Sequence, residues 1–125
     1  MQFAFNDTEP LFQQVTDQLA ALILSGAVGE GEQLPSTTEI AGRYHLNPAT
    51  VLKGVNQLVD QGLAYKQRGI GMFVQTGARA KLQAARRTQF VTQDVAQLVR
   101  TARQLGLTQE QVIDMIESGY SHAAD

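Results

Sequence analysis

The chain has 125 residues, of which 43% are hydrophobic and 18% charged, so it can bury a core and fits one small domain with or without an appendage. It contains no cysteine, which excludes a disulfide framework, a thiolate metal site and a cysteine nucleophile. Its formal net charge of -2, taken alone, argues against a nucleic-acid-binding protein.

The basic residues, however, are concentrated in one part of the chain. All ten lysines and arginines lie between Arg43 and Arg103, together with only two acidic residues, which gives this window a charge of +8. Residues 1–42 hold six acids and no base, and residues 104–125 hold four acids and no base. Such segregation indicates a partner better than the total charge does, and it makes the middle of the chain a candidate nucleic-acid-binding region.

Apolar periodicity predicts a first helix between Pro10 and Gly26. Proline is tolerated in a first helical turn because its missing N–H has no partner there, and glycine commonly follows the last helical residue. A glycine-containing loop comes next, and residues 33–35 are expected to form a short extended piece.

Two capping signals predict a second and a third helix close together. Ser36 and Glu39 form a capping box, in which the Ser36 hydroxyl accepts from the Glu39 N–H and the Glu39 carboxylate accepts from the Ser36 N–H. This short helix stops near Tyr44. Asn47, followed by proline, caps a third helix that closes at Gly62. A gap of about three residues is the spacing of a helix-turn-helix.

The periodicity then changes to that of strands. Short β-type runs at 63–67 and 72–75 flank Arg68-Gly69-Ile70-Gly71, whose glycines permit a tight hairpin turn. A phosphate-binding loop is the alternative for this segment, but it requires a following helix. Three helices and a hairpin describe a winged helix-turn-helix, expected over residues 1–76.

Residues 77–125 are predicted to form a two-helix tail, so the fold class is mostly α with a small β-hairpin. A long helix over 78–105 carries a heptad seam, and a capping box at Thr108 begins a last helix that ends at Gly119, with fraying over 118–125. The seam could pack only within the chain, but a tail of this size buries little by itself, so we favour dimerisation. The residues expected at the dimer interface are Val91, Val95, Leu98, Ala102, Leu105, Val112 and Ile116.

Four motifs occur in order between residues 8 and 75. They are Pro10-Leu11-Phe12-Gln13-Gln14-Val15, Gly26 through Gly31-Glu32-Gln33-Leu34-Pro35-Ser36, Asn47-Pro48-Ala49-Thr50-Val51, and Arg68-Gly69-Ile70-Gly71-Met72-Phe73-Val74. Together they resemble the GntR family of bacterial transcription regulators. The short tail resembles the YtrA-type subfamily, whose members carry two helices there instead of a large ligand-binding domain.

The resemblance implies a homodimer that binds double-stranded DNA, with the third helix in the major groove and the wing tip at the minor groove. Many members have arginine at the position of Thr38, and several at the position of Ala49. Threonine and alanine cannot read guanine bidentately, so base readout is expected to rely on Thr50, Lys53, Asn47 or Asn56, and on DNA shape. The residues expected to contact DNA are Ser36, Thr38, Arg43, Asn47, Ala49, Thr50, Lys53, Asn56, Lys66, Arg68, Ile70 and Gly71.

Four more cations begin the long helix: Arg79, Lys81, Arg86 and Arg87. They either extend the positive field toward DNA or solvate the linker, and the second interpretation is favoured for Arg86 and Arg87. Arg43, Lys66 and Arg68 are interpreted as phosphate contacts, which contribute affinity without direct sequence information.

The expected function is a sequence-specific transcription regulator, a repressor that occludes an inverted-repeat operator. The alternative is a winged helix that binds only proteins, which the positive window and the polar face of the third helix oppose. No nucleophile–base pair or metal-ligand set stands out, so neither an enzyme nor a cofactor is expected. A small-molecule effector is a candidate partner at the apolar side of the tail, near Phe90, Leu98, Val112 and Ile116.

The expected location is the cytoplasm. No apolar run reaches the roughly 18 residues that a membrane helix needs, and residues 1–7 lack the basic and apolar regions of a signal peptide.

Overall fold

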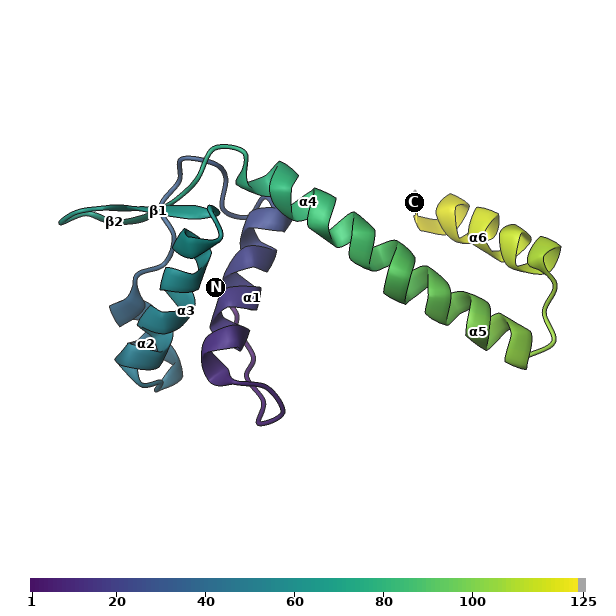
Figure 1. Cartoon of the computed structure of the whole chain (residues 1–125), viewed down its shortest axis with the longest axis horizontal. Coiled ribbons are helices and arrows are strands. Elements are labelled where there is room, and N and C mark those ends of the chain that lie inside the picture. The colour runs from purple at the N-terminus through teal and green to yellow at the C-terminus, as the bar shows by residue number, and fades with distance from the viewer. Residues whose placement is uncertain (124–125) are drawn as a thin grey trace. The chain divides into compact units, whose positions relative to one another are not determined.

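The computed structural model describes residues 1–123, and its contacts divide the chain into two units (Figure 1). The winged unit, Met1–Ala84, contains α1 (Leu11–Ser25), α2 (Thr37–Tyr44), α3 (Pro48–Asp60), strands β1 (Ala64–Gln67) and β2 (Gly71–Val74), and the start of α4 (Ala78–Gln89). The tail unit, from Ala85 onward, contains the end of α4, the π-helix η1 (Phe90–Val95), α5 (Ala96–Gln104) and α6 (Gln109–Ala123). The predicted fold class is confirmed.

The core of the winged unit lies where α1 and α3 cross. Val15 and Leu19 of α1 and Val55 of α3 are buried there, and each such side chain contributes about 1.5–3 kcal/mol relative to exposure. The two helices approach closely because residue 54 is glycine. A Cβ at Gly54 would lie 2.6 Å from the Phe12 carbonyl oxygen and 2.9 Å from the Val15 Cβ. The crossing therefore sets the position of α3.

The predicted capping residues begin both helices of the helix-turn-helix, although the bond from the Ser36 N–H to the Glu39 carboxylate is not formed within residues 1–123. The Ser36 hydroxyl accepts a hydrogen bond from the Glu39 N–H (3.0 Å), and the Asn47 side-chain oxygen accepts one from the Ala49 N–H (2.8 Å). Between the helices, His45 adopts a left-handed conformation with φ of 55°, and the Leu46 N–H returns to the Ala41 carbonyl (2.9 Å).

The segment before α1 is ordered against that helix, although the sequence predicted no structure for it. The Gln18 side-chain amide both accepts from the Ala4 N–H (2.8 Å) and donates to the Ala4 carbonyl (2.9 Å), as a neighbouring β-strand would. Gln14 makes the same pair of bonds with Asn6, both of 2.9 Å, and also donates to the Glu9 carbonyl (2.8 Å). Two glutamines one helical turn apart thus hold this segment in place.

An aromatic cluster joins the same segment to the end of α2. The ring of Tyr44 stacks on Phe3 at 5.6 Å between centroids and meets the edge of Phe5 at 5.5 Å. The Tyr44 hydroxyl accepts from the Phe3 N–H (2.8 Å) and donates to the Met1 carbonyl (3.0 Å). The alternation of Phe3 and Phe5 was the one sequence signal for this packing.

We expect Tyr44→Phe to lower the free energy of unfolding by about 1 kcal/mol, because it removes both hydrogen bonds and keeps the ring contacts. Urea unfolding followed by circular dichroism measures the change. Tyr65→Phe is the matched control, since the Tyr65 ring stacks on Phe73 at 5.6 Å and the structure shows no hydrogen bond from its hydroxyl within residues 1–123. Equal losses in the two variants would contradict the prediction.

A third extended segment supports the antiparallel hairpin of β1 and β2. The Gly31 N–H donates to the Val74 carbonyl (2.9 Å), and the Val74 N–H donates to the Glu32 carbonyl (3.0 Å). The Leu34 N–H bonds the Met72 carbonyl at 2.8 Å, which confirms the predicted extended piece. A two-stranded hairpin is marginally stable alone, so this pairing stabilises the wing.

Sequence analysis predicted one uninterrupted helix over residues 78–105. The structure instead contains the π-helix η1 between α4 and α5. Within it, the Thr92 hydroxyl donates to the Thr88 carbonyl (3.1 Å), an oxygen that an α-helix reserves for a backbone N–H, and such competition distorts helices. Arg86 and Asp94 form an ion pair of 3.0 Å across this region, with both side chains about half exposed. Pairs so exposed add little stability.

The last helix begins as predicted and ends later. Thr108 and Gln111 form the full reciprocal capping box, with bonds of 2.8 and 3.1 Å. Helix α6 then continues through Gly119 to Ala123, so the predicted end at Gly119 and the fraying from 118 are wrong up to residue 123. A glycine inside an exposed helix costs only about 1 kcal/mol, which does not end it. The expected fraying of residues 124–125 lies outside the described residues.

None of the helices within residues 1–123 combines the length and the apolar character required to cross a membrane.

Candidate nucleic-acid interface

Helix α3 presents a polar outer face because its apolar residues recur on the opposite side. Val51, Val55 and Leu58 are buried in the core. The predicted contact residues Ala49, Lys53 and Asn56 are exposed at three- and four-residue steps, on the other side of the helix. Thr50, one residue from the core position 51, is half-buried, and the cap residue Asn47 is exposed.

Lys53 is not free on this face but lies over an aromatic ring of α1. Its ammonium nitrogen is 4.0 Å from the centroid of the Phe12 ring, a cation–π contact worth about 0.5–1 kcal/mol at an exposed site. The pair borders a shallow hollow of about 440 Å³ between α1 and α3. Its lining residues are Phe12, Ala49, Leu52, Lys53, Asn56, Gln57 and Asp60. Sequence analysis predicted neither the contact of Phe12 with Lys53 nor the exposure of Leu52.

Around α3, the other predicted contact residues are also on the surface. Ser36 and Thr38 are exposed at the start of α2, and Arg43 is exposed in its last turn, 5.8 Å from the centre of the Tyr44 ring. On the wing, the side chains are exposed at Lys66, Arg68 and Ile70, and Gly71 is half-buried.

The four cations of α2, α3 and the wing have no acidic partners among the described residues 1–123. The ion pair that the structure shows within residues 1–123 joins Arg86 to Asp94, in the tail. Arg43, Lys53, Lys66 and Arg68 are thus available to an anion, and phosphate is the anion that a duplex offers.

The cations at the start of α4 have a structural role that neither sequence interpretation described. The Arg79 guanidinium donates to the Leu24 carbonyl near the end of α1 (3.0 Å), and the Lys81 ammonium donates to the Gln61 carbonyl just after α3. The Glu30 carboxylate accepts from the Gly77 N–H (2.8 Å). These bonds attach the start of α4 to the winged unit.

The tail unit leaves most of its apolar side chains uncovered. The residues predicted for the dimer interface are exposed at Val91, Leu98, Leu105 and Ile116, half-buried at Val95 and Val112, and buried at Ala102. Ala102 is the one buried residue of the tail unit within the described chain. Exposed apolar side chains gathered in this way are typical of an interaction surface.

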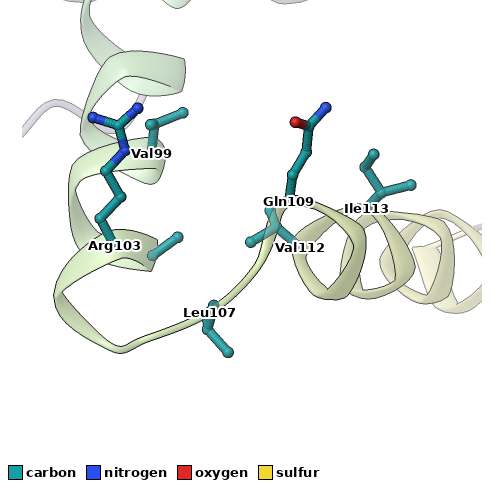
Figure 2. A pocket seen from close by; sticks show the side chains of 7 residues that line it. Val99, Arg103, Leu107, Gln109, Val112 and Ile113 are labelled. Atoms are coloured by element: carbon teal, nitrogen blue, oxygen red, sulfur yellow. The ribbon is translucent and has the colours of Figure 1, made fainter.

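Helices α5 and α6 enclose two hollows within the tail unit. Figure 2 shows the larger one, of about 330 Å³, which is lined by Val99 and Arg103 on α5 and by Val112 and Ile113 on α6. Three of the predicted effector-site residues, Leu98, Val112 and Ile116, line the second, of about 210 Å³. No cluster of three His, Cys, Asp or Glu side chains within residues 1–123 is placed to hold a metal ion.

A helix-turn-helix with a supported hairpin, an exposed polar third helix and unpaired cations around it define a winged helix-turn-helix protein. The chain belongs to the GntR family of transcription regulators, since the family model "Bacterial regulatory proteins, gntR family" matches residues 11–74. It is therefore a transcription regulator with a DNA-binding domain, in a family of regulators rather than enzymes.

Similarity to individual family members extends beyond this domain. The transcriptional repressor YtrA of Bacillus subtilis is 29% identical over 108 residues, which cover 86% of this chain and 82% of that protein. This confirms the resemblance to the YtrA type. A solved structure of a GntR-family regulator from Bacteroides thetaiotaomicron is 28% identical, covers 90% of this chain and 98% of its own, and superposes with a TM-score of 0.70.

A third relative shows the winged domain on DNA. The DNA-binding domain of AraR, solved in complex with its operator ORR3, is 26% identical to this chain, covering 59% of this chain and 89% of that domain with a TM-score of 0.52.

Proposed function

We propose that this protein is a cytoplasmic homodimeric repressor, which binds an inverted-repeat operator and blocks access to a promoter. The observation that carries the proposal is the exposed outer face of α3, which carries Lys53 and Asn56 and has Arg43, Lys66 and Arg68 around it; none of these four cations has an acidic partner within residues 1–123. The repressor YtrA and the operator-bound AraR domain support it by similarity.

Base recognition in this proposal comes from the first three turns of α3. An α-helix fits the major groove of B-DNA, where its exposed side chains reach the base edges. The Asn56 amide can bond adenine, and the methyl groups of Ala49 and Thr50 can contact thymine. The Asn47 side-chain oxygen already caps Ala49, so only its amide N–H groups remain available.

Phosphate binding comes from the cations that surround α3. Arg43 at the end of α2, with Lys66 and Arg68 on the wing, would contact the sugar-phosphate backbone on either side of the groove. Such contacts contribute affinity and orientation, and base contacts contribute specificity. The proposal therefore separates the two roles by position: reading residues on α3, and phosphate contacts around it.

The dimer in this proposal forms through the tail, residues 77–125, with residues 1–76 as the DNA-binding domain. A second copy would cover the exposed apolar side chains of α5 and α6, and two-fold symmetry would match two half-sites about 34 Å apart or a multiple of that. An effector would bind in the smaller hollow between α5 and α6, which is lined by Leu98, Val112 and Ile116. It would change the angle between the two winged units of the dimer.

The test removes two reading residues together. We expect Thr50→Ala combined with Lys53→Ala to lower operator affinity by about 10- to 100-fold, since each lost contact costs about 1 kcal/mol or more. The operator is first selected from genomic fragments, and affinity is then measured by fluorescence anisotropy. Size-exclusion chromatography is expected to show an unchanged dimer.

Arg87→Ala is the matched control, because it removes an exposed cation of the tail unit, which is not part of the winged unit that carries α3 and the wing. Its operator affinity should be close to that of the unaltered chain. Binding by the unaltered chain should weaken steeply between about 50 and about 200 mM salt. Failure to bind any genomic fragment at the lower salt concentration would reject the proposal and favour a protein-interaction module.

A further inference from the structure

The wing tip has few contacts of its own. Arg68, Gly69 and Ile70 are exposed, and the Ile70 N–H closes the turn on the Gln67 carbonyl at 3.0 Å. Gly69 has φ of 79°, a left-handed conformation that glycine adopts without strain. A tip held only by this turn would be mobile before binding, and ordering it on DNA would reduce affinity.

One side chain from outside the hairpin contacts the tip. Gln33 lies in the extended segment before α2 and forms a β-bridge with Phe73 of β2. From there its side-chain Nε2 donates a hydrogen bond to the Ile70 carbonyl at 3.0 Å. The bond joins residues that are 37 positions apart, and it fixes the tip backbone between the two strands.

Gly71 provides the space for this contact. A Cβ on Gly71 would lie 2.5 Å from Gln33 Nε2, closer than real Cβ atoms approach, and 3.5 Å from Gln33 Cδ. Gly71 also has φ of 148°, which side-chain-bearing residues rarely adopt. The glycine at position 71 and the amide at position 33 are therefore complementary: the first leaves the volume that the second occupies.

We propose that Gln33 is a positioning residue for operator binding, which acts by holding the wing tip in the geometry that presents Arg68 and Ile70 to the minor groove. The inference rests on the proposed function. Gln33 need not contact DNA itself. Its amide orders the wing tip when the chain folds, so the entropic cost of ordering the tip is not added to DNA binding. The same contact connects the wing to the segment that leads into α2, three residues before the Ser36 cap.

Gln33→Leu tests this role, because leucine keeps much of the side-chain volume and removes the N–H donor. In the DNA-free protein, we expect the heteronuclear NOE values of the Gly69, Ile70 and Gly71 amides to fall, and those of β1 to remain. Operator affinity should fall by about three- to tenfold, the equivalent of one hydrogen bond of about 1 kcal/mol.

A second background separates positioning from general stability. In a chain that carries Arg68→Ala and Ile70→Ala, the proposed contacts of the wing tip with DNA are already lost. Adding Gln33→Leu to that chain should therefore not lower operator affinity further. An equal loss in both backgrounds would overturn the positioning role and indicate a merely structural one.

The remaining outcomes distinguish the inference from the proposed function. Unchanged NOE values at the tip would overturn the inference alone, as would a more mobile tip with unchanged operator affinity. Failure of the unaltered chain to bind operator would overturn both. In that case the NOE comparison in the DNA-free protein would still show whether Gln33 orders the tip.

Discussion

Gly54→Ala is expected to lower the free energy of unfolding by about 2 kcal/mol, even though alanine is the better helix former by about 1 kcal/mol. The added methyl would lie 2.6 Å from the Phe12 carbonyl oxygen and 2.9 Å from the Val15 Cβ. A backbone oxygen cannot rotate away, and Val15 is fully buried, so α1 and α3 must move apart. Guanidinium unfolding followed by far-ultraviolet circular dichroism measures the loss.

Gly42→Ala is the matched control, an identical change in a neighbouring helix. Gly42 lies inside α2, is exposed, and has no atom within 4 Å of its ideal Cβ position. Only the helix propensity changes there, so we expect stability to rise by up to about 1 kcal/mol. We expect the free energy of unfolding to rise for Gly42→Ala and to fall for Gly54→Ala. A stabilised Gly54→Ala variant would show that α1 and α3 do not cross as closely as described.

Leu98→Glu is expected to convert the proposed dimer to a monomer. Leu98 is 43% exposed on α5 and lies in the predicted seam with Leu105, which is 68% exposed. In a symmetric dimer, each substitution places a carboxylate in an apolar contact, and burying an unpaired charge costs several kcal/mol. Size-exclusion chromatography with light scattering measures the mass, and operator affinity should fall because a monomer binds one half-site.

Gln97→Glu is the control for the added charge. The Gln97 side-chain oxygen accepts from the Arg100 guanidinium (2.8 Å), and a glutamate oxygen would preserve that contact on the same helix, outside the seam. This variant should remain dimeric. Circular dichroism distinguishes a folded monomer from an unfolded chain in the Leu98→Glu protein, and a dimer of unchanged mass would reject the seam as the interface.

The elements that sequence analysis predicted well are those whose signals are local. The first turn of α2 is stabilised by a serine hydroxyl three residues from its donor, and that of α3 by an asparagine two residues from its donor. Such contacts form from consecutive residues, so they can be predicted without knowledge of the fold. The predicted end of α6 at Gly119 was wrong because a single glycine, without a capping contact, is a weak signal for the end of a helix.

The details of the candidate site depend on pairs far apart in the chain. Sequence analysis predicted that Lys53 contacts DNA, but it did not predict the position of Lys53 over Phe12, which is 41 residues earlier and belongs to another helix. It assigned Gln33 no function, because the bond to Ile70 exists only when an extended segment pairs with β2. An aromatic ring or an amide has many available partners, and nothing local selects one of them.

The sequence by itself determined the order of helices and strands and the concentration of cations around the third helix, because periodicity, caps and composition are properties of neighbouring residues. The family was predicted separately, from the resemblance of four ordered motifs to known regulators. Only the tertiary structure decided which side chains are held in place at the interface. The close crossing at Gly54, the contact of Lys53 with Phe12, and the bond from Gln33 to Ile70 arise when packing brings distant segments within a few ångströms. Their physical reason is excluded volume and hydrogen bonding in three dimensions, which spacing along the chain does not encode.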